Sequence, residues 1–145
     1  MSTILVVDDK QLVREAIGKL LEYAGFEVLT ARNGREAWAM MYQRPPDLVL
    51  LDLMMPNVDG WTVAEALADD EGTRDIPIVF LTARATTNDR MRAEKLGALG
   101  YVLKPFDPVR LAPLVTGVVA RCSRGEADEL RRERPQELWP ADLEG

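Results

Sequence analysis

The sequence of 145 residues contains no histidine and a single cysteine, Cys122. The lack of histidine excludes histidine-based catalytic triads, histidine metal ligands and phosphohistidine chemistry within this chain. A lone cysteine excludes an internal disulfide, which is typical of proteins from a reducing compartment. We therefore expect a cytoplasmic protein whose chemistry depends on other side chains.

Long apolar stretches and an excess of positive charge are missing too. No run approaches the roughly 20 apolar residues that a membrane-spanning helix needs, and no secretory-signal pattern opens the chain. The net charge of −6 disfavours general binding to nucleic acid through a basic surface. We expect neither membrane nor nucleic-acid partners. With 47% hydrophobic and 29% charged residues, the composition is that of a globular domain with one core.

Short β-rich runs alternate with helix-like segments along most of the chain. Strands are expected at residues 3–7, 27–31, 47–52, 77–82 and 100–104. Helices are expected at residues 11–24, 35–43, 61–69, 87–96 and 108–121. This alternation predicts a doubly wound, three-layer α/β sandwich in which right-handed crossovers place five helices on both faces of a five-stranded parallel sheet. The run at 47–52 is the most apolar, and we expect it to be central.

The composition changes beyond Arg121. The last expected helix, at residues 108–121, contains Pro113. This predicts a kink or a late start of that helix, because a proline inside a regular helix costs ~3 kcal/mol. Residues 122–145 carry four arginines and seven acidic residues. We expect the helix to continue through 126–134, to stop at Pro135 and to be followed by a loose tail. The predicted division is a domain at 1–121 and a charged extension at 122–145, partly helical or disordered and too short for an effector domain.

Four of the predicted strands end in polar residues of types that phosphate chemistry uses. Asp8 and Asp9 follow the first strand, Asp52 the third, Thr82 the fourth and Lys104 the fifth. The carboxyl ends of parallel strands meet at one edge, where open α/β sheets bind ligands. Three carboxylates there would repel unless a proton or a cation joined them, and oxygen ligands suit Mg²⁺. Aspartate can also form an acyl phosphate, so Asp52 is a candidate nucleophile.

Each of these residues also has an ordinary structural explanation. Asp9 is a candidate N-cap of the helix at 11–24, and Thr82 is a common type of residue at a strand end. Lys104 precedes Pro105, and residues before proline favour extended geometry. The combination favours a functional site, because separate strand ends deliver chemically compatible groups.

These residues carry a resemblance to the receiver domain of two-component response regulators, over about residues 3–121. The matching stretches are ILVVDD at 4–9, DLVLLDLMMP at 47–56, Asp59-Gly60, PIVFLTA at 77–83 and GALGYVLKP at 97–105. The resemblance implies a CheY-like, flavodoxin-like fold. It also implies a stand-alone phosphorylation-controlled switch.

The resemblance assigns roles to the acidic residues. Asp52 is the implied phosphoacceptor. Mg²⁺ is expected to be bound directly by Asp9, by Asp52 and by the backbone carbonyl of Met54, and through water by Asp8.

Further roles follow for the fourth and fifth strand ends. The resemblance implies that Thr82, the Ala83 backbone and Lys104 contact the phosphoryl group, and that the Lys104–Pro105 bond is cis. By the same resemblance, Thr82 and Tyr101 form the switch pair. Without the resemblance, Tyr101 is explained as a half-buried aromatic residue on a strand. The switch would act by shifting populations between two arrangements.

Some residues depart from the family pattern or flank its site. Leu99-Gly100 stands where the family usually has a more polar residue before the fifth strand. This position lies on the surface formed by helix four, strand five and helix five, through which the family meets its targets or dimerises. Met54 and Arg84, two residues after Asp52 and Thr82, are candidates for tuning the lifetime of the acyl phosphate. The alternative for Arg84 is an exposed loop charge.

Three functional classes compete. The leading hypothesis is a switch that receives phosphate from a histidine kinase or a phosphotransfer protein and regulates a downstream protein, as a monomer or weak dimer; a relay intermediate is a variant of it. Such a protein catalyses only its own phosphorylation and dephosphorylation. Aspartate-nucleophile phosphohydrolases usually carry a second aspartate where this chain has Met54, which argues against that class. The intact set of strand-end residues argues against a phosphorylation-independent adaptor.

Overall fold

The computed structural model describes residues 1–56, 58–84 and 86–139. The strands are β1 (Thr3–Val7), β2 (Glu27–Ala31), β3 (Leu48–Leu51), β4 (Ile78–Thr82) and β5 (Gly100–Leu103). The helices are α1 (Gln11–Tyr23), α2 (Gly34–Gln43), α3 (Gly60–Asp69), α4 (Thr87–Lys95), α5 (Pro108–Ser123) and α6 (Ala127–Glu133), followed by a 3-10 turn, η1 (Gln136–Leu138). The predicted α/β class and the five predicted strands are confirmed. In the part of the chain described, no helix combines the length and apolar character needed to cross a membrane.

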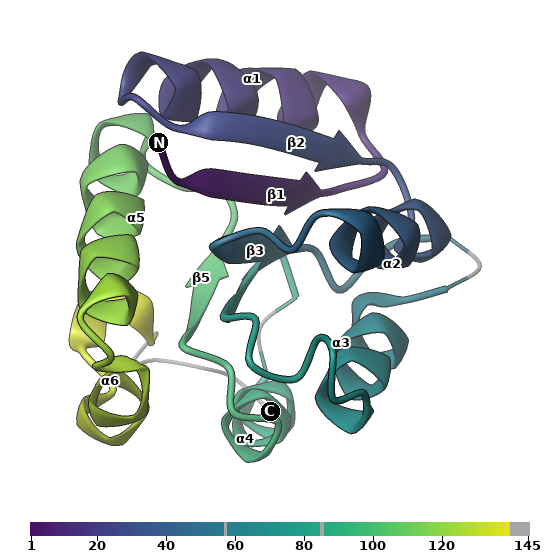
Figure 1. Ribbon diagram of the computed structural model, residues 1–145, viewed down its shortest axis with the longest axis vertical. Helices are drawn as coiled ribbons and strands as arrows, with labels where there is room; N and C mark the ends of the chain where they lie inside the picture. Colours follow the sequence, from purple (N-terminus) through teal and green to yellow (C-terminus); the bar gives the residue numbers. More distant parts are fainter. Residues whose placement is uncertain (57, 85, 140–145) are drawn as a thin grey trace.

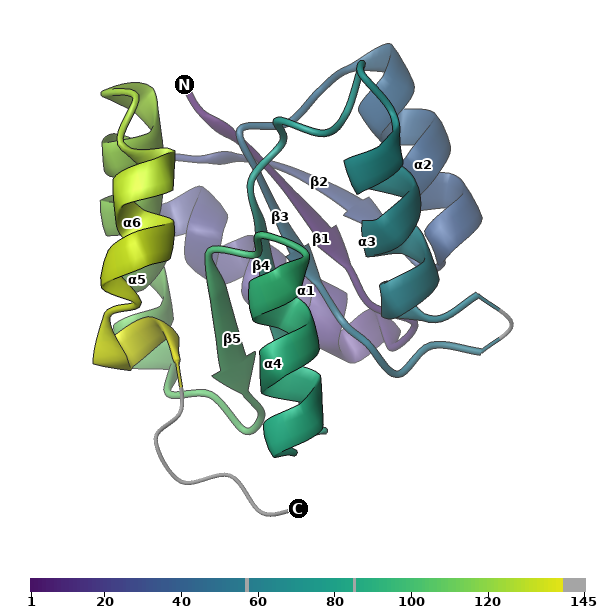
Figure 2. The ribbon, with the colours of Figure 1, turned by 90° about the horizontal axis from the view of Figure 1, so that it is seen from below.

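The strands form one parallel sheet in the order β2-β1-β3-β4-β5, so β3 is central, as predicted. Helices α1 and α5 cover one face, and α2, α3 and α4 cover the other (Figures 1 and 2). The chain leaves β1 for β2 on one side and returns to β3 on the other. This reversal between β1 and β3 creates the crevice where doubly wound sheets bind ligands.

The sheet is buried because helices cover both of its faces. Every residue of β1 and β3 is buried, which explains why these strands read as continuous apolar runs rather than as alternating patterns. The largest fully buried side chains are Tyr101, Phe80, Ile4, Leu5, Ile17, Leu21, Met41, Leu48, Leu50, Leu51, Leu67 and Leu99.

Four helices begin at residues whose side chains cap the first turn. Asn33, Asp59, Thr86 and Asp107 precede α2, α3, α4 and α5 and accept hydrogen bonds from backbone N–H groups of those helices. Each such cap stabilises a helix by about 1 kcal/mol. The caps place the helix starts close to the carboxyl ends of the strands, around the crevice.

The last helix begins at residue 108, as expected, so of the two alternatives offered for Pro113, a kink or a late start, the late start is wrong. Helix α5 begins directly at Pro108, after the Asp107 cap, and Pro113 lies inside it. A proline has no N–H, so Pro113 deprives the carbonyl four residues earlier of its helical partner. That carbonyl belongs to Val109, which is 81% exposed, so water can replace the lost hydrogen bond.

The expected continuation of this helix and the loose tail need correction. Gly125, with a φ of +78°, ends α5, and α6 is a separate sixth helix. The chain stays ordered beyond Pro135, because η1 brings Leu138 and Trp139 into the core with 2% and 3% exposure. The extension therefore contains α6 and η1 and is packed as far as residue 139; residues 140–145 lie outside the described part.

Candidate functional site

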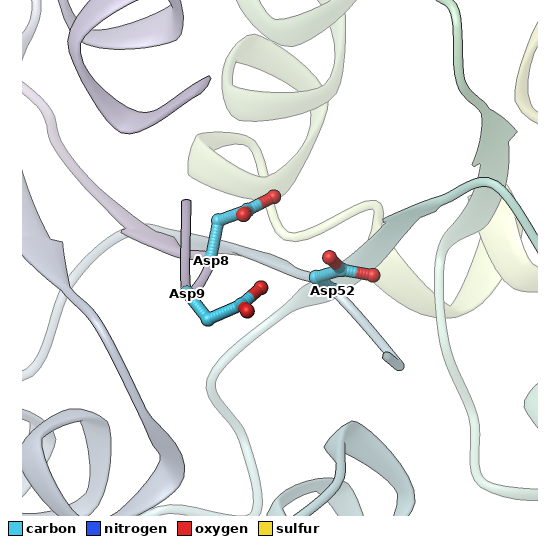
Figure 3. A group of neighbouring side chains, drawn as sticks. All are labelled: Asp8, Asp9 and Asp52. Carbon is cyan, nitrogen blue, oxygen red and sulfur yellow. The ribbon is translucent and has the colours of Figure 1, made fainter. Parts of the chain in front are cut away.

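The three aspartates meet at the crevice between β1 and β3. Val7 pairs with Leu51 in the sheet, and the Asp52 N–H donates to the Val7 carbonyl at 3.0 Å. The residues that follow the two strands are therefore side by side. One carboxylate oxygen from each of Asp8, Asp9 and Asp52 lies within 4.8 Å of the others (Figure 3). The predicted convergence of these carboxylates is present.

Asp9 has no capping role in this structure. The N-cap position of α1 is held by Lys10, which makes no side-chain cap bond. The Lys10 N–H instead donates to Asp8 Oδ1 at 2.9 Å. Asp9 Oδ1 is buried and has no hydrogen-bond partner among the described residues. A buried carboxylate oxygen left without a partner costs free energy, so this atom is suited to a cation.

Lys104 brings the one ammonium group that contacts this cluster among the described residues. Its Nζ donates to Asp8 Oδ2 and, at 3.1 Å, to Asp52 Oδ2. The Lys104 N–H donates to the Thr82 carbonyl at 2.8 Å, and the Lys104–Pro105 bond is cis, as expected. The two contacts of Nζ place the Lys104 side chain over the residues that follow β1 and β3.

Burial and charge act in opposite directions on the ionisable groups. Burial raises the pKa of Asp8 above its ordinary value, although hydrogen bonds from Lys104 and the Lys10 N–H oppose this. Burial alone would lower the pKa of Lys104, but the hydrogen bonds and charges of Asp8 and Asp52 raise it. The ammonium is therefore firmly charged. One positive charge still faces three carboxylates.

The donor set fits a magnesium ion. Mg²⁺ prefers oxygen ligands and neutralises clustered carboxylates, and here one carboxylate oxygen has no other described partner. Asp52 Oδ1 also accepts the Met54 N–H at 3.1 Å, which orients the carboxylate. The Met54 side chain is 57% exposed beside the site. The Met54 carbonyl as a ligand stays a prediction.

A backbone-centred network connects Thr82 with Tyr101. The Arg84 N–H donates to Thr82 Oγ1 at 3.2 Å, and the Tyr101 hydroxyl donates to the Arg84 carbonyl. Tyr101 lies on β5, as expected, but it is fully buried rather than half-buried, so its ring is directed inward. Burial raises the pKa of Tyr101, which keeps the hydroxyl a hydrogen-bond donor. Thr82 is also fully buried. Its hydroxyl oxygen accepts the Arg84 N–H, and this bond does not engage the hydroxyl proton.

Arg84 is more than an exposed loop charge. Its Nε lies 2.8 Å from Oδ2 of Asp89 in the first turn of α4, and the Asp89 side chain is 6% exposed. The pair ties the loop after β4 to α4. Sequence reasoning missed Asp89 because an acidic residue in a first helical turn is common and is ordinarily explained by the helix dipole.

A family model described as a response regulator receiver domain matches residues 4–116. The phosphate regulon transcriptional regulatory protein PhoB of Pseudomonas aeruginosa is 41% identical over 126 residues, covering 87% of this chain and 55% of PhoB. The DNA-binding dual master transcriptional regulator RpaA of a Synechocystis strain is 36% identical over 148 residues, covering 99% of this chain and 61% of RpaA. The chain thus spans little more than half the length of these relatives.

Solved structures show the same fold. The chemotaxis protein CheY4 of Vibrio cholerae matches with a TM-score of 0.76 and 31% identity, covering 81% of this chain and 98% of that one. The receiver domain of a signal transduction histidine kinase from Syntrophus aciditrophicus matches with a TM-score of 0.77 and 31% identity, covering 86% and 94%.

Proposed function

Because the chain belongs to the response regulator receiver family, whose members act in phosphorylation-dependent signalling, we propose that it is a switch phosphorylated on Asp52. The position of Asp52 at the β1–β3 crevice, with its carboxylate against Lys104 and beside Asp9, is the observation that supports this most. An Asp52 oxygen would form the bond to phosphorus while the donor's bond to phosphorus breaks, leaving an acyl phosphate.

The neighbouring residues have separate tasks in this proposal. Asp9, Asp52 and the Met54 carbonyl would hold Mg²⁺ directly, with Asp8 acting through water. The ion, when bound, supplies charge neutralisation for phosphoryl oxygens. Lys104 is held as a cation by its two carboxylate contacts and could transfer its hydrogen bond from Asp52 to a phosphoryl oxygen.

Thr82 and Tyr101 would report the modification. Thr82 can donate its hydroxyl proton to a phosphoryl oxygen, and the Ala83 backbone N–H would lie beside it. The Arg84 N–H bond to Thr82 and the Tyr101 bond to the Arg84 carbonyl support a coupling between phosphate and the inward tyrosine. A phosphoryl group shifts this equilibrium only to the extent that it binds one arrangement better.

Met54 and Arg84 remain the candidates for setting the lifetime of the acyl phosphate. Met54 is exposed next to Asp52, where its side chain can restrict the approach of water. Arg84 is directed to Asp89, so in this arrangement its side chain tethers α4.

The partners follow from the family. A histidine kinase or a phosphotransfer protein would supply the phosphate, in the cytoplasm, and a protein would receive the output. The expectation of no nucleic-acid partner stays a prediction, because the matched relatives are named as transcriptional regulators. Catalysis would be limited to the chain's own phosphorylation and dephosphorylation.

Intact mass tests the proposal. The protein is incubated with Mg²⁺ and acetyl phosphate, and one added phosphoryl group is expected on wild type. Asp52→Asn should acquire none, and Asp47→Asn, which changes an aspartate at the opposite end of β3, should label like wild type.

Two results would contradict the proposal. One is an unmodified wild type under conditions that label a known receiver domain. The other is equal labelling of Asp52→Asn, which would place the phosphate elsewhere.

A further inference from the structure

Asp89 occupies an unusual place for an acidic residue. The buried residues of α4 are Asp89 and Ala93, which are four positions apart and therefore lie on the same face of the helix. Aspartate is almost never fully buried unless it is paired. An exposed carboxylate in the first turn would serve the helix dipole equally well, so the burial of Asp89 needs another explanation.

The position of Asp89 is fixed from two sides. Its N–H donates to Oγ1 of the cap residue Thr86 at 3.0 Å, and its Oδ2 lies 2.8 Å from Arg84 Nε. The Asp89 side chain is 6% exposed, whereas the Arg84 side chain is 52% exposed. Asp89 is thus the buried anchor of this ion pair, and Arg84 is the residue that it holds.

Arg84 makes three contacts with three different groups. Its N–H donates to Thr82 Oγ1 at 3.2 Å, and its carbonyl accepts the hydroxyl of Tyr101. Its guanidinium pairs with Asp89. Holding the side chain of Arg84 limits where its two backbone groups can lie. Asp89 therefore acts on both backbone contacts through a single residue.

The Tyr101 hydroxyl responds to charge at both ends of this connection. Helix α4 packs beside β5, the strand that carries Tyr101 (Figure 2). Burial raises the pKa of Tyr101, and the negative charges of Asp89 and Asp52 raise it further. The inward hydroxyl is therefore within electrostatic reach of both the proposed phosphoacceptor and the anchor on α4.

We propose that Asp89 is a positioning residue of the switch, which holds Arg84 so that the Arg84 backbone links Thr82 to the inward Tyr101. Its consequence for Asp52 rests on the proposed function, but its effect on Tyr101 is tested in the unmodified chain. Phosphorylation that favours the linked arrangement would depend on the population of that arrangement. Loss of Asp89 should therefore release Tyr101 and slow the labelling of Asp52.

The test compares Asp89→Asn, Arg84→Met and the double variant in the full chain. Asp89→Asn keeps the shape of the side chain and removes its charge, and Arg84→Met removes the guanidinium. Residues that act through one contact should not have additive effects. Glu94→Gln is the matched control, because Glu94 lies in the same helix and also pairs with an arginine, Arg90, at 3.2 Å.

The environment of Tyr101 is measured by fluorine NMR of the unmodified protein. Fluorotyrosine is incorporated in a background in which Tyr23 and Tyr42 are replaced by phenylalanine, so that Tyr101 gives the only signal. A protein that retains Tyr23, which is 97% exposed, supplies the signal of an exposed ring.

Asp89→Asn and Arg84→Met should each move the Tyr101 signal toward that of the exposed ring. The double variant should resemble either single variant, and Glu94→Gln should resemble wild type. Since the Arg84 side chain is half-exposed, Arg84→Met tests the link even if Asp89→Asn fails to fold. An unchanged Tyr101 signal in the folded single variants, or fully additive shifts, would overturn the proposal.

Labelling by acetyl phosphate and Mg²⁺ gives the second measurement. The rate should fall about threefold or more in Asp89→Asn, while Mg²⁺ should raise the unfolding temperature as in wild type, because the carboxylate cluster is unaltered. Equal labelling rates in wild type and Asp89→Asn would also overturn the proposal. An unlabelled wild type would instead contradict phosphorylation of Asp52, and the Tyr101 signal would then decide the role of Asp89 by itself.

Discussion

At the scale of the residue, the site depends on one ammonium placed between buried carboxylates. The side chains of Asp8 and Asp52 are 3% and 6% exposed, and that of Lys104 is 16% exposed. Such a triad adds little net stability while intact, but removal of one partner leaves charge buried without compensation. Lys104 therefore has a structural task in addition to its proposed role toward phosphate.

Replacing Lys104 by methionine should lower the free energy of unfolding by about 3–5 kcal/mol in EDTA, because Asp8 and Asp52 lose their cation. Urea unfolding at neutral pH measures the loss. Mg²⁺ should restore more stability to Lys104→Met than to wild type. Lys19→Met, on the exposed side of α1, is the control and should change stability little. A variant as stable as wild type in EDTA would contradict the assigned contacts.

Among the described residues, the Tyr101 hydroxyl makes a single hydrogen bond, to the Arg84 carbonyl. Tyr101→Phe should cost about 0.5–1.5 kcal/mol of stability, since the ring stays and only this bond is lost. Tyr23→Phe serves as the control, because Tyr23 is 97% exposed. Equal unfolding midpoints for the two variants would show that the bond contributes nothing.

At the scale of the element, α3 begins against the backbone of Asp52, the proposed phosphoacceptor. A Cβ at Gly60 would contact the Asp52 carbonyl and lie 2.8 Å from Leu53 Cα, both of them backbone atoms. The Gly60 N–H donates to the Leu53 carbonyl at 3.1 Å. The first turn of α3 thus supports the loop that holds Asp52.

Gly60→Ala should destabilise the protein by about 1–3 kcal/mol and slow phosphorylation, because the backbone after β3 must move. Gly18→Ala, in α1, is the matched control, since its nearest neighbour would be 3.8 Å away. That control should be neutral or stabilising by up to about 1 kcal/mol. Thermal unfolding and acetyl phosphate labelling together measure both effects.

The junction of α5 and α6 depends on Arg121, which lies 3.0 Å from Glu126 and 2.6 Å from Glu133. Hydrogen bonds from Arg124 and Arg121 hold the pKa of Glu126 below its ordinary value, and Arg121 does the same for Glu133. Groups with a lowered pKa stabilise the folded state above the ordinary value of 4.5. Their contribution is lost as the pH falls through the lowered pKa.

Amide protection of α6 should therefore decline below about pH 4.5, before that of β1 and β3. Hydrogen exchange corrected for its intrinsic pH dependence is the measurement. Arg121→Gln should weaken this pH dependence, because Glu133 loses its partner while Arg124 still lowers the pKa of Glu126. Protection of α6 that follows the sheet at every pH would contradict the expectation.

At the scale of the whole molecule, the fold concentrates negative charge at the carboxyl edge of its sheet. A bound cation would connect residues from β1 and β3 and stabilise the folded state alone. Stabilisation by a ligand grows with its concentration and reaches about 2.7 kcal/mol at a hundred times its dissociation constant.

Mg²⁺ should accordingly raise the unfolding temperature of wild type in a saturable way. Asp9→Asn should abolish this rise. In EDTA the variant should be at least as stable as wild type, because one of three repelling carboxylates is gone. Asp75→Asn, an exposed position, should respond to Mg²⁺ like wild type. An unchanged Mg²⁺ response in Asp9→Asn would exclude this residue as a ligand.

Much of the fold and the site could be predicted because the signals are local. A strand buried on both faces must be apolar throughout, and its first polar residue marks the carboxyl end, as Asp8 and Asp52 do. Parallel pairing then brings those ends together wherever the strands lie in the sequence. The start of the helix at residue 108 was predicted correctly, but the late start considered as one effect of Pro113 did not occur, because the carbonyl that loses its partner belongs to the exposed Val109.

The remaining features arise from contacts between distant parts of the chain. Gly100 and Leu138 lie far apart in sequence, and neither shows by itself that it accommodates the other. Asp89 looks like an ordinary residue of a first helical turn until Arg84 is seen beside it. Trp139 stands among charged residues that indicate a solvated tail.

The sequence by itself determined the α/β class, the central position of β3 and the grouping of Asp8, Asp9 and Asp52. It could do so because the hydrophobic pattern of a segment and the residue that ends a strand are local properties. Only the tertiary structure decided that Tyr101 lies inward and that the segment at residues 127–139 packs against β5 and α5. Those outcomes depend on which buried surfaces meet, and that is settled by packing between segments that the chain brings together from far apart.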